Sequence, residues 1–190
     1  MQLNLIMMRK ISLLAILVLT LLSAFPQKNK NLEKPDLPID EKTQTVTYKE
    51  VVQQEGTPQE LFDRAMDWVK SYYKNTNEVI KSQDRESGII ELRSSVRIYG
   101  TQKDGSKHMR NIVYYKCKIE CRDKRYRYVI SDFTEKATAV SPIEVWFDTE
   151  NPKWEPAHFE YLKQIDEQVK EIIASMKNGM NQKIEQEEEW

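Results

Sequence analysis

The sequence GIIELRSSVRIYGTQKDGSKHMRNIVYYKCKIECRDKRYRYVISDF, residues 88–133, decides the fold, because apolar and polar side chains alternate along three successive runs. In the first two runs the apolar positions are Ile90, Leu92, Val96 and Ile98, then Val113, Tyr115, Cys117, Ile119 and Cys121. A period of two is typical of a strand with one buried and one solvent-facing side. We therefore expect three long strands of a β-meander with one dry face.

Turn signals separate the three runs. Ser87-Gly88 precedes the first run, Asp104-Gly105 lies between the first and second, and residues 122–124 lie between the second and third. An Asp-Gly pair between two alternating runs strongly favours a β-hairpin, because both residues tolerate the positive φ that tight turns require.

A helix is expected on each side of the meander. Thr57, Pro58 and Glu60 form a capping box with proline at the first helical position. A wide apolar and aromatic stripe follows at helical spacing. A second helix is expected from about residue 156 to 177, with Gly179 placed to close it. Both stripes are suited to packing on the dry face of the sheet.

Shorter strands at residues 43–52 and 78–83 complete the expected order of strand, helix, four strands and helix. This order predicts an α+β domain, an antiparallel sheet of about five strands with two helices packed on one face. The single domain is expected at residues 43–180, between a polar, proline-containing linker at 26–42 and an acidic tail at 181–190.

The first 25 residues have the pattern of an export signal. Arg9 and Lys10 precede a short apolar run at residues 11–25, as in the charged and hydrophobic regions of a secretory signal peptide. The run is shorter than the roughly 20 residues of a spanning helix. We therefore expect cleavage after Ala24 rather than an uncleaved membrane anchor. The protein would then be periplasmic or secreted, and would touch a membrane only through this segment before cleavage.

The chain resembles a family of exported bacterial domains in four features taken together: the export signal, the capped helix, the meander, and the tryptophan-containing run that leads into the last helix. That family is a domain of unknown function with a TATA-binding-protein-like fold. The resemblance covers about residues 37–180 and rests on GTPQELF from Gly56 and on residues 111–121 and 126–133. It implies an antiparallel sheet with helices on one face, and it brings no activity and no catalytic residues.

The residue types that support catalysis are scarce. Cys117 and Cys121 are the only cysteines, and His108 and His158 are the only histidines. Strand residues four apart are separated by roughly 13 Å, farther than the about 7 Å that a disulfide spans, so we expect two buried free thiols. We expect both histidines on the surface. No metal-ligand spacing and no phosphate-binding glycine motif occurs, and we expect no metal and no cofactor.

One constellation stands out, on the polar side of the meander. Its basic members are Arg93, Arg97, Lys116, Lys118, Arg125 and Arg127, its aromatic members are Tyr99 and Tyr114, and its acidic members are Glu91 and Glu120. Basic side chains interleaved with aromatics can bind a polyanion. Export and a net charge of −1 argue against nucleic acid, so the expected partner is an anionic ligand or an envelope protein. The alternative is a solvated face whose charges only protect the sheet.

A second candidate surface lies just before the last helix. Ile143, Val145, Trp146 and Phe147 form a short apolar patch, a small strand or a flap, near Trp154. Exposed tryptophans there could stack on a glycan, whereas packing on the last helix would bury them.

Taken together, the sequence indicates a non-catalytic binding or assembly module with an unknown ligand. The alternative is a hydrolase of envelope polymers, whose catalytic carboxylates would leave no trace in the sequence.

Overall fold

Six strands and two long helices make up the described part of the chain, which in this computed structural model is residues 33–102, 104–136 and 140–181. The elements in chain order are β1 (Tyr48–Gln53), α2 (Pro58–Tyr72), α3 (Thr76–Val79), β2 (Ile80–Asp84), β3 (Ile89–Thr101), β4 (Lys107–Arg122), β5 (Arg125–Lys136), β6 (Val140–Pro142), the 3-10 helix η1 (Ile143–Phe147) and α4 (Ala157–Asn181). The predicted signal peptide and all but the first residue of the predicted acidic tail lie outside the described residues. No helix among the described residues combines the length and apolarity needed to cross a bilayer.

All six strands pair antiparallel in one sheet. The order is β1-β5-β4-β3-β2, and β6 pairs with the last residues of β5. The β3–β4 hairpin runs from Ile89 opposite Glu120 to Thr101 opposite Lys107, and β5 returns along the other side of β4. These three strands are the expected meander, and the α+β class is confirmed. The sheet contains one short strand, β6, beyond the expected set.

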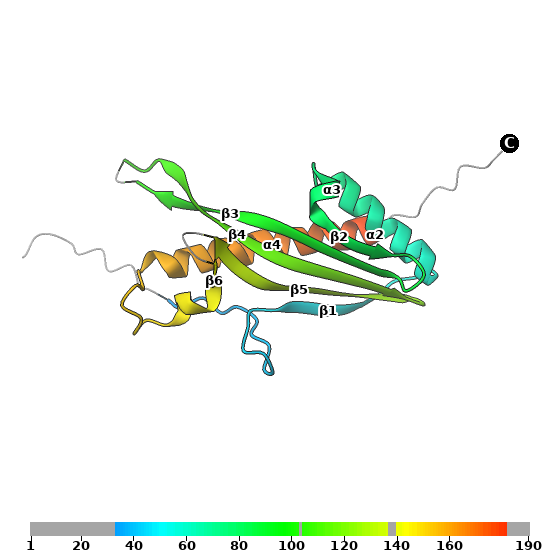
Figure 1. The fold of residues 1–190 in the computed structure, drawn as a ribbon, viewed down its shortest axis with the longest axis horizontal. Coiled ribbons are helices and arrows are strands. Elements are labelled where there is room, and N and C mark those ends of the chain that lie inside the picture. The colour runs from blue at the N-terminus through cyan, green and yellow to red at the C-terminus, as the bar shows by residue number, and fades with distance from the viewer. Residues whose placement is uncertain (1–32, 103, 137–139, 182–190) are drawn as a thin grey trace, which may run out of the picture. The chain divides into compact units, whose positions relative to one another are not determined.

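The two long helices lie on the same face of the sheet (Figure 1). The side chains beneath them follow the parity expected from the sequence, and the following are at most 4% exposed: Ile90, Leu92, Val96, Ile98, Val113, Tyr115, Cys117, Ile119, Cys121, Tyr126, Tyr128 and Ile130. Cys117 and Cys121 are therefore buried free thiols, as expected. Burial raises the pKa of each thiol to about 12.

Helix α2 begins at the capping box expected from the sequence. The Thr57 hydroxyl accepts a hydrogen bond from the Glu60 amide at 3.3 Å, and the Glu60 carboxylate accepts one from the Thr57 amide at 2.7 Å. Two amides that the helix cannot pair internally are thereby satisfied.

Helix α4 continues past the residue expected to close it. Gly179 lies inside the helix, which ends at Asn181, so the predicted C-cap is wrong. A Cβ atom built on Gly179 would lie 2.8 Å from the Cβ of Trp68 in α2. The glycine is needed because the two helices approach each other closely at this point.

Helix α4 also covers part of the edge of β3. The Gln164 side-chain amide accepts a hydrogen bond from the Tyr99 amide and donates one to the Tyr99 carbonyl, both at 2.9 Å. Gln168 makes the same pair of bonds to Arg97, at 3.3 and 3.0 Å. The two glutamines thus take the place of a neighbouring strand where β2, which pairs only with residues 89–92, does not reach.

Two short segments differ from the sequence-based expectation. The strand expected at residues 78–83 begins as one helical turn, α3, and becomes extended at Ile80. The apolar patch at residues 143–147 is a 3-10 helix rather than a strand or flap, and it buries Ile143 and Trp146.

Packing begins inside the stretch expected to be a linker. Leu37 is 5% exposed within the core, and Ile39 forms an antiparallel bridge with Val46. The first regular strand begins only at Tyr48.

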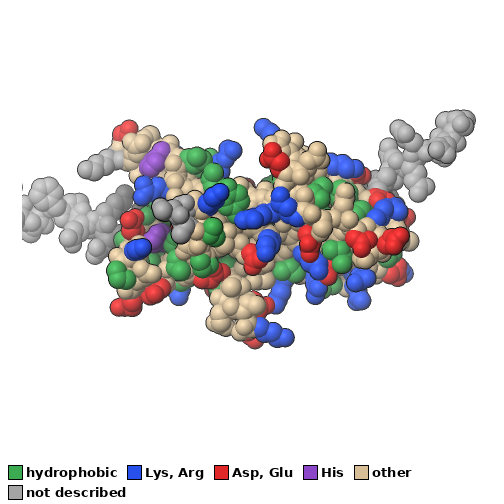
Figure 2. Space-filling view, viewed as in Figure 1, with side chains coloured by type: hydrophobic (Ala, Val, Ile, Leu, Met, Phe, Trp, Pro, Cys, Tyr) green, Lys and Arg blue, Asp and Glu red, His purple; other side chains and the backbone are tan. Residues whose placement is uncertain are grey.

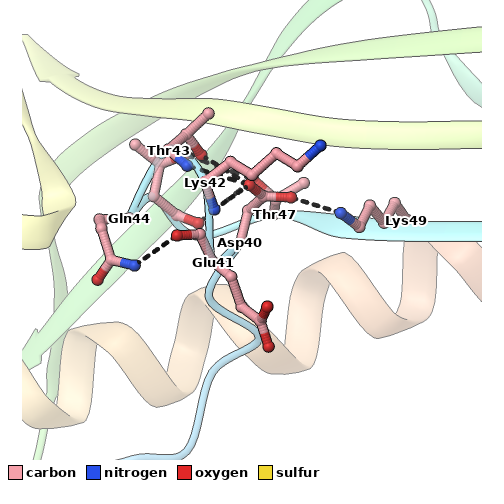
Figure 3. A network of polar contacts seen from close by, with 8 residues as sticks. Asp40, Glu41, Lys42, Thr43, Gln44, Thr47 and Lys49 are labelled. Atoms are coloured by element: carbon pink, nitrogen blue, oxygen red, sulfur yellow. Dashed lines mark hydrogen bonds and ion pairs between the residues drawn. The ribbon is translucent and has the colours of Figure 1, made fainter.

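A turn centred on Asp40 connects the two sides of that bridge. One carboxylate oxygen accepts hydrogen bonds from the amides of Lys42 and Thr43, at 3.0 and 3.1 Å, and the other pairs with the Lys49 ammonium group (Figure 3). The Lys49 contact and these amides hold the pKa of Asp40 well below its usual range. The turn is stabilised locally and fixes the entry of the chain into β1.

Candidate functional site

The face of the sheet opposite α2 and α4, here called the open face, carries most of the basic side chains of the strands. Lysine and arginine gather across the middle of this face (Figure 2). Its basic residues include Lys81 on β2, Arg93 and Arg97 on β3, Lys116, Lys118 and Arg122 on β4, and Arg125, Arg127 and Lys136 on β5. Alternation along β3, β4 and the first half of β5 places most of them here, because their neighbours in sequence point into the core.

A central groove of about 470 Å³ crosses the open face. Its charged lining residues are Lys81, Arg93, Lys116, Lys118 and Glu91. Four basic groups against one carboxylate give this groove a clear positive charge.

A second groove of about 440 Å³ adjoins the central one. It shares Lys81 and Arg93 with the central groove and adds Tyr114 and Lys136. The Arg93 guanidinium lies over the Tyr114 ring, 5.7 Å from its centroid, a distance typical of a cation–π contact. Because the two grooves meet at Lys81 and Arg93, a ligand longer than a single ion could occupy both.

Strand register places two like charges directly opposite each other in the central groove. Arg93 on β3 pairs with Lys116 on β4, whereas the next pair along the same face, Glu91 with Lys118, is oppositely charged. Like charges opposite each other across two strands are destabilising. The sequence alone could not show this pair, because it depends on the register.

A β-bulge supplies one of the few acidic partners. Between Tyr114 and Lys116 the pairing with β5 shifts, because β5 holds one extra residue. Asp132 lies there with φ of 55°, a conformation that Asp tolerates better than most residues. Its carboxylate contacts the Lys116 ammonium group at 2.7 Å. Lys116 is therefore partly neutralised, whereas no ion pair among the described residues involves Arg93.

Glu120 balances two further basic residues. It pairs with Arg127 and, at 3.3 Å, with Lys118, while its own side chain is only 12% exposed. Burial acts to raise the pKa of Glu120, but the two basic partners outweigh burial and lower the pKa. Lys118 and Arg127 are thus held in fixed positions on the open face.

The structure separates the eight residues proposed from the sequence into three places. Arg93, Tyr114, Lys116 and Lys118 line the two adjoining grooves. Arg125 and Arg127 line a depression of about 230 Å³ near the β4–β5 turn. Arg97 and Tyr99 share the side of Arg93 by alternation but lie farther along the β3–β4 hairpin, and they are not among the described residues that line these three grooves.

Sequence reasoning missed Lys81, Arg122 and Lys136. Lys81 lies at an irregularity in the pairing of β2 with β3, between Ile80 and Ser82, so simple alternation does not assign its side. Arg122, which the sequence predicts in the turn at residues 122–124, ends β4. Lys136 lies beyond the run in which alternation was clear.

Trp146 and Trp154 do not form the exposed surface that stacking on a glycan would need. Trp146 is 3% exposed and stacks on His158, with ring centroids 5.3 Å apart and planes 3° apart. The Trp154 indole donates a hydrogen bond to the Trp146 carbonyl at 2.8 Å. Both tryptophans pack against the start of α4, the alternative considered from the sequence.

The described residues offer little for hydrolysis. Each of the three grooves is lined by a single carboxylate: Glu91, Glu78 or Glu120. Within residues 33–102, 104–136 and 140–181, no three His, Cys, Asp or Glu side chains converge as a metal site would require. His108 and His158 are half-buried rather than on the surface, and neither is among the described residues that line these three grooves.

Comparison with known proteins identifies the fold. Residues 48–136 match the family model described as "Domain of unknown function (DUF4468) with TBP-like fold". A TBP-like protein from Parabacteroides distasonis ATCC 8503 superposes with a TM-score of 0.61 at 18% identity, covering 75% of this chain and 96% of that one. A DUF4468 family protein from Bacteroides ovatus ATCC 8483 gives 0.61 at 12% identity, with 79% and 93% covered. No curated protein matches the sequence. At these identities the likeness shows the fold alone.

Proposed function

Because this chain contains a DUF4468 domain with a TBP-like fold, a domain of unknown function, we propose from the geometry of the open face that it is a non-catalytic binding module for an anionic ligand. The ligand lies in the central groove, where Arg93 and Lys116 contact it from neighbouring strands.

The observation that carries this proposal is the like-charged pair of Arg93 and Lys116. Such a pair costs the sheet about 0.2–1 kcal/mol, and an anion between the two side chains would remove the repulsion. Among the ion pairs of the described residues, Asp132 pairs with Lys116 and not with Arg93, so the groove keeps an excess of positive charge. A purely protective face would need no such concentration of one sign.

The shape of the surface favours an extended ligand with several negative charges. The two adjoining grooves share Lys81 and Arg93, and together they continue past Tyr114 to Lys136 at the end of β5. An acidic polymer can place charges along this path, whereas a single small anion would use only part of it.

The test measures binding of dextran sulfate, with neutral dextran as the uncharged probe. We expect dextran sulfate to bind and to weaken as salt is added, because each neutralised charge releases counterions. The double variant Arg93→Glu with Lys116→Glu should weaken binding by about tenfold or more, as expected for loss of charged contacts.

A matched control changes the net charge by the same amount elsewhere. Lys74→Glu with Lys163→Glu places the reversals at exposed positions, after α2 and on α4. The control should leave binding nearly unchanged. Equal losses in both double variants, or binding of neutral dextran as strong as that of dextran sulfate, would refute the groove as the binding site.

We further propose that the protein is exported and processed after Ala24. Arg9, Lys10 and the apolar run that follows support this. Expression of the full chain in a bacterial host, followed by fractionation and intact mass measurement, tests the proposal. Full-length protein in the cytoplasmic fraction would contradict it.

A further inference from the structure

The β4–β5 turn carries a second pair of like charges on the open face. Arg122 ends β4, Arg125 begins β5, and the two lie directly opposite each other, both exposed. They line the depression of about 230 Å³ together with Arg127. Arg127 pairs with Glu120, but the ion pairs among the described residues leave Arg122 and Arg125 without an acidic partner. The turn therefore presents two unbalanced guanidinium groups side by side.

The end of α4 lies close to this turn. The Arg64 guanidinium donates to the carbonyls of Met180, at 3.5 Å, and Glu55, at 2.8 Å, through the same nitrogen. The residues on either side of Glu55 bond to Lys124 in the turn: the Gln54 amide donates to the Lys124 carbonyl, and the Lys124 amide donates to the Gly56 carbonyl, both at 3.0 Å. Figure 1 shows the end of α4 beside α2, at the same end of the sheet as the turn.

The residues that follow α4 are strongly acidic. Residues 182–190 read QKIEQEEEW and contain Glu185, Glu187, Glu188 and Glu189 against one lysine. Nine residues can span at most about 30 Å when fully extended. Because Arg122 and Arg125 lie on the face of the sheet opposite α4, the segment has to pass around the end of the sheet, and its extended length is the reach available for this path.

We propose that residues 182–190 of the same chain bind the Arg122–Arg125 pair through their glutamates. Charge complementarity, the direct opposition of the two arginines and the position of the end of α4 support this occupant. Attachment to the same chain raises its effective concentration to the millimolar range, so weak ion pairs suffice. The acidic segment would then compete with an external anion that approaches the open face from this end.

The test uses the full chain with a nitroxide spin label on Gln186→Cys. Cys117 and Cys121 are 1% exposed, so the introduced thiol is labelled selectively. We expect paramagnetic loss of the amide signals of Arg122 and Arg125, with signals near Lys107 at the far end of β4 retained. The signals should return in about 1 M NaCl, where the Debye length falls to about 3 Å.

Two variants, one in the turn and one in residues 182–190, test where the interaction occurs. All of these measurements are made without dextran sulfate, so their outcome is independent of the proposed function. Arg122→Glu with Arg125→Glu should restore the amide signals of the turn, while Lys74→Glu with Lys163→Glu should not. Glu187→Gln, Glu188→Gln and Glu189→Gln together should also restore them, and this variant leaves every described residue unchanged. Retained signals at Arg122 and Arg125 in the labelled parent, or signal loss that disappears on dilution, would overturn docking within one chain.

Discussion

Gly179 has no side chain, and this allows α4 to approach α2 closely. Trp68, the residue it faces, is 3% exposed and fixed by donating a hydrogen bond to the Ser175 hydroxyl at 3.1 Å. Gly179→Ala would gain about 1 kcal/mol of helix propensity but would place its Cβ 2.8 Å from the Trp68 Cβ. Overpacking costs about 1–3 kcal/mol. We therefore expect a net loss of about 1 kcal/mol in the free energy of unfolding, measured by urea titration.

Asn178→Ala provides the comparison for that prediction. Asn178 is exposed one position earlier in α4, so the substitution changes helix propensity without touching α2. It should leave stability unchanged or slightly increased. If Gly179→Ala stabilised the protein as well, the close contact with Trp68 would not constrain the helix packing.

The two cysteines should be unreactive in the folded protein. Burial raises the pKa of both thiols to about 12, so at about pH 8 the thiolate fraction is on the order of 10⁻⁴. The thiolate is the reactive species. We expect a thiol reagent to modify neither Cys117 nor Cys121 until urea unfolds the chain, and then to modify both. Rapid modification of one thiol in native buffer would contradict its burial.

At the scale of residues, alternation predicted burial well and missed contacts between elements. The parity of residues 88–133 placed both cysteines and Tyr115 correctly on the buried side, because a pleated strand fixes the side of every side chain. Phe133 is buried against that parity, because the bulge just before it shifts the alternation. Gly179 was misassigned because a glycine near a helix end is usually a cap. Only the position of Trp68, 111 residues earlier in the sequence, shows its other role.

At the scale of elements, α4 protects the edge of β3. The side-chain amides of Gln164 and Gln168 together make four hydrogen bonds to the backbone of Tyr99 and Arg97. A net contribution of about 0.5–1.5 kcal/mol per bond is usual, and water can replace some of them. Gln164→Ala with Gln168→Ala should therefore lower the free energy of unfolding by about 1–3 kcal/mol. The amides of Arg97 and Tyr99 should also exchange hydrogen faster.

Glu167→Ala serves as the control for the two glutamines, because Glu167 is exposed on the same helix. It should change neither stability nor exchange at β3. An uncovered edge can pair with another chain, so the double variant should also associate more at high concentration. Unchanged exchange at Arg97 and Tyr99 would show that these side-chain bonds do not protect the edge.

Irregularities in the strands explain why the candidate site was only partly predictable. The bulge at Asp132 brings a carboxylate to Lys116, and the irregular pairing at Ile80 and Ser82 brings Lys81 into the groove. An alternating sequence contains no signal for either. Strand register also limits prediction of the site. It places Arg93 directly opposite Lys116 although 22 residues lie between them in the sequence.

At the scale of the whole molecule, the near-zero net charge conceals an uneven distribution. The formal charge is −1, yet the central groove holds four basic residues and one carboxylate. Net charge therefore argues only against strong non-specific attraction. Whether a ligand binds depends on the local arrangement of charges. Alternation in the sequence predicts which basic side chains share the open face, and the strand register and bulges determine which of them are neighbours.

Stability of the whole molecule should fall in two stages as the pH is lowered. Burial lowers the pKa of His158 below its ordinary 6.5, despite the opposing effect of Glu155. The unfolded chain then binds this proton first, so stability is complete above about pH 6.5 and declines below it. The pKa values of Glu50 and Asp63 are lowered by Lys177 and Arg85. Their contribution is present above about pH 4 and is lost as the pH falls further.

Urea unfolding between about pH 8 and 3 measures both stages. His158→Phe keeps an aromatic ring against Trp146 but cannot take up a proton, so it should abolish the decline that begins near pH 6.5 and leave the acidic decline in place. The variant also loses the hydrogen bond that the Glu155 amide donates to His158 Nδ1 at 3.1 Å, which lowers stability equally at every pH where the wild-type imidazole is neutral. The slope with pH, rather than the absolute stability, therefore identifies the titrating group. A variant with an unchanged slope between about pH 7 and 5 would show that the upper stage belongs to another residue.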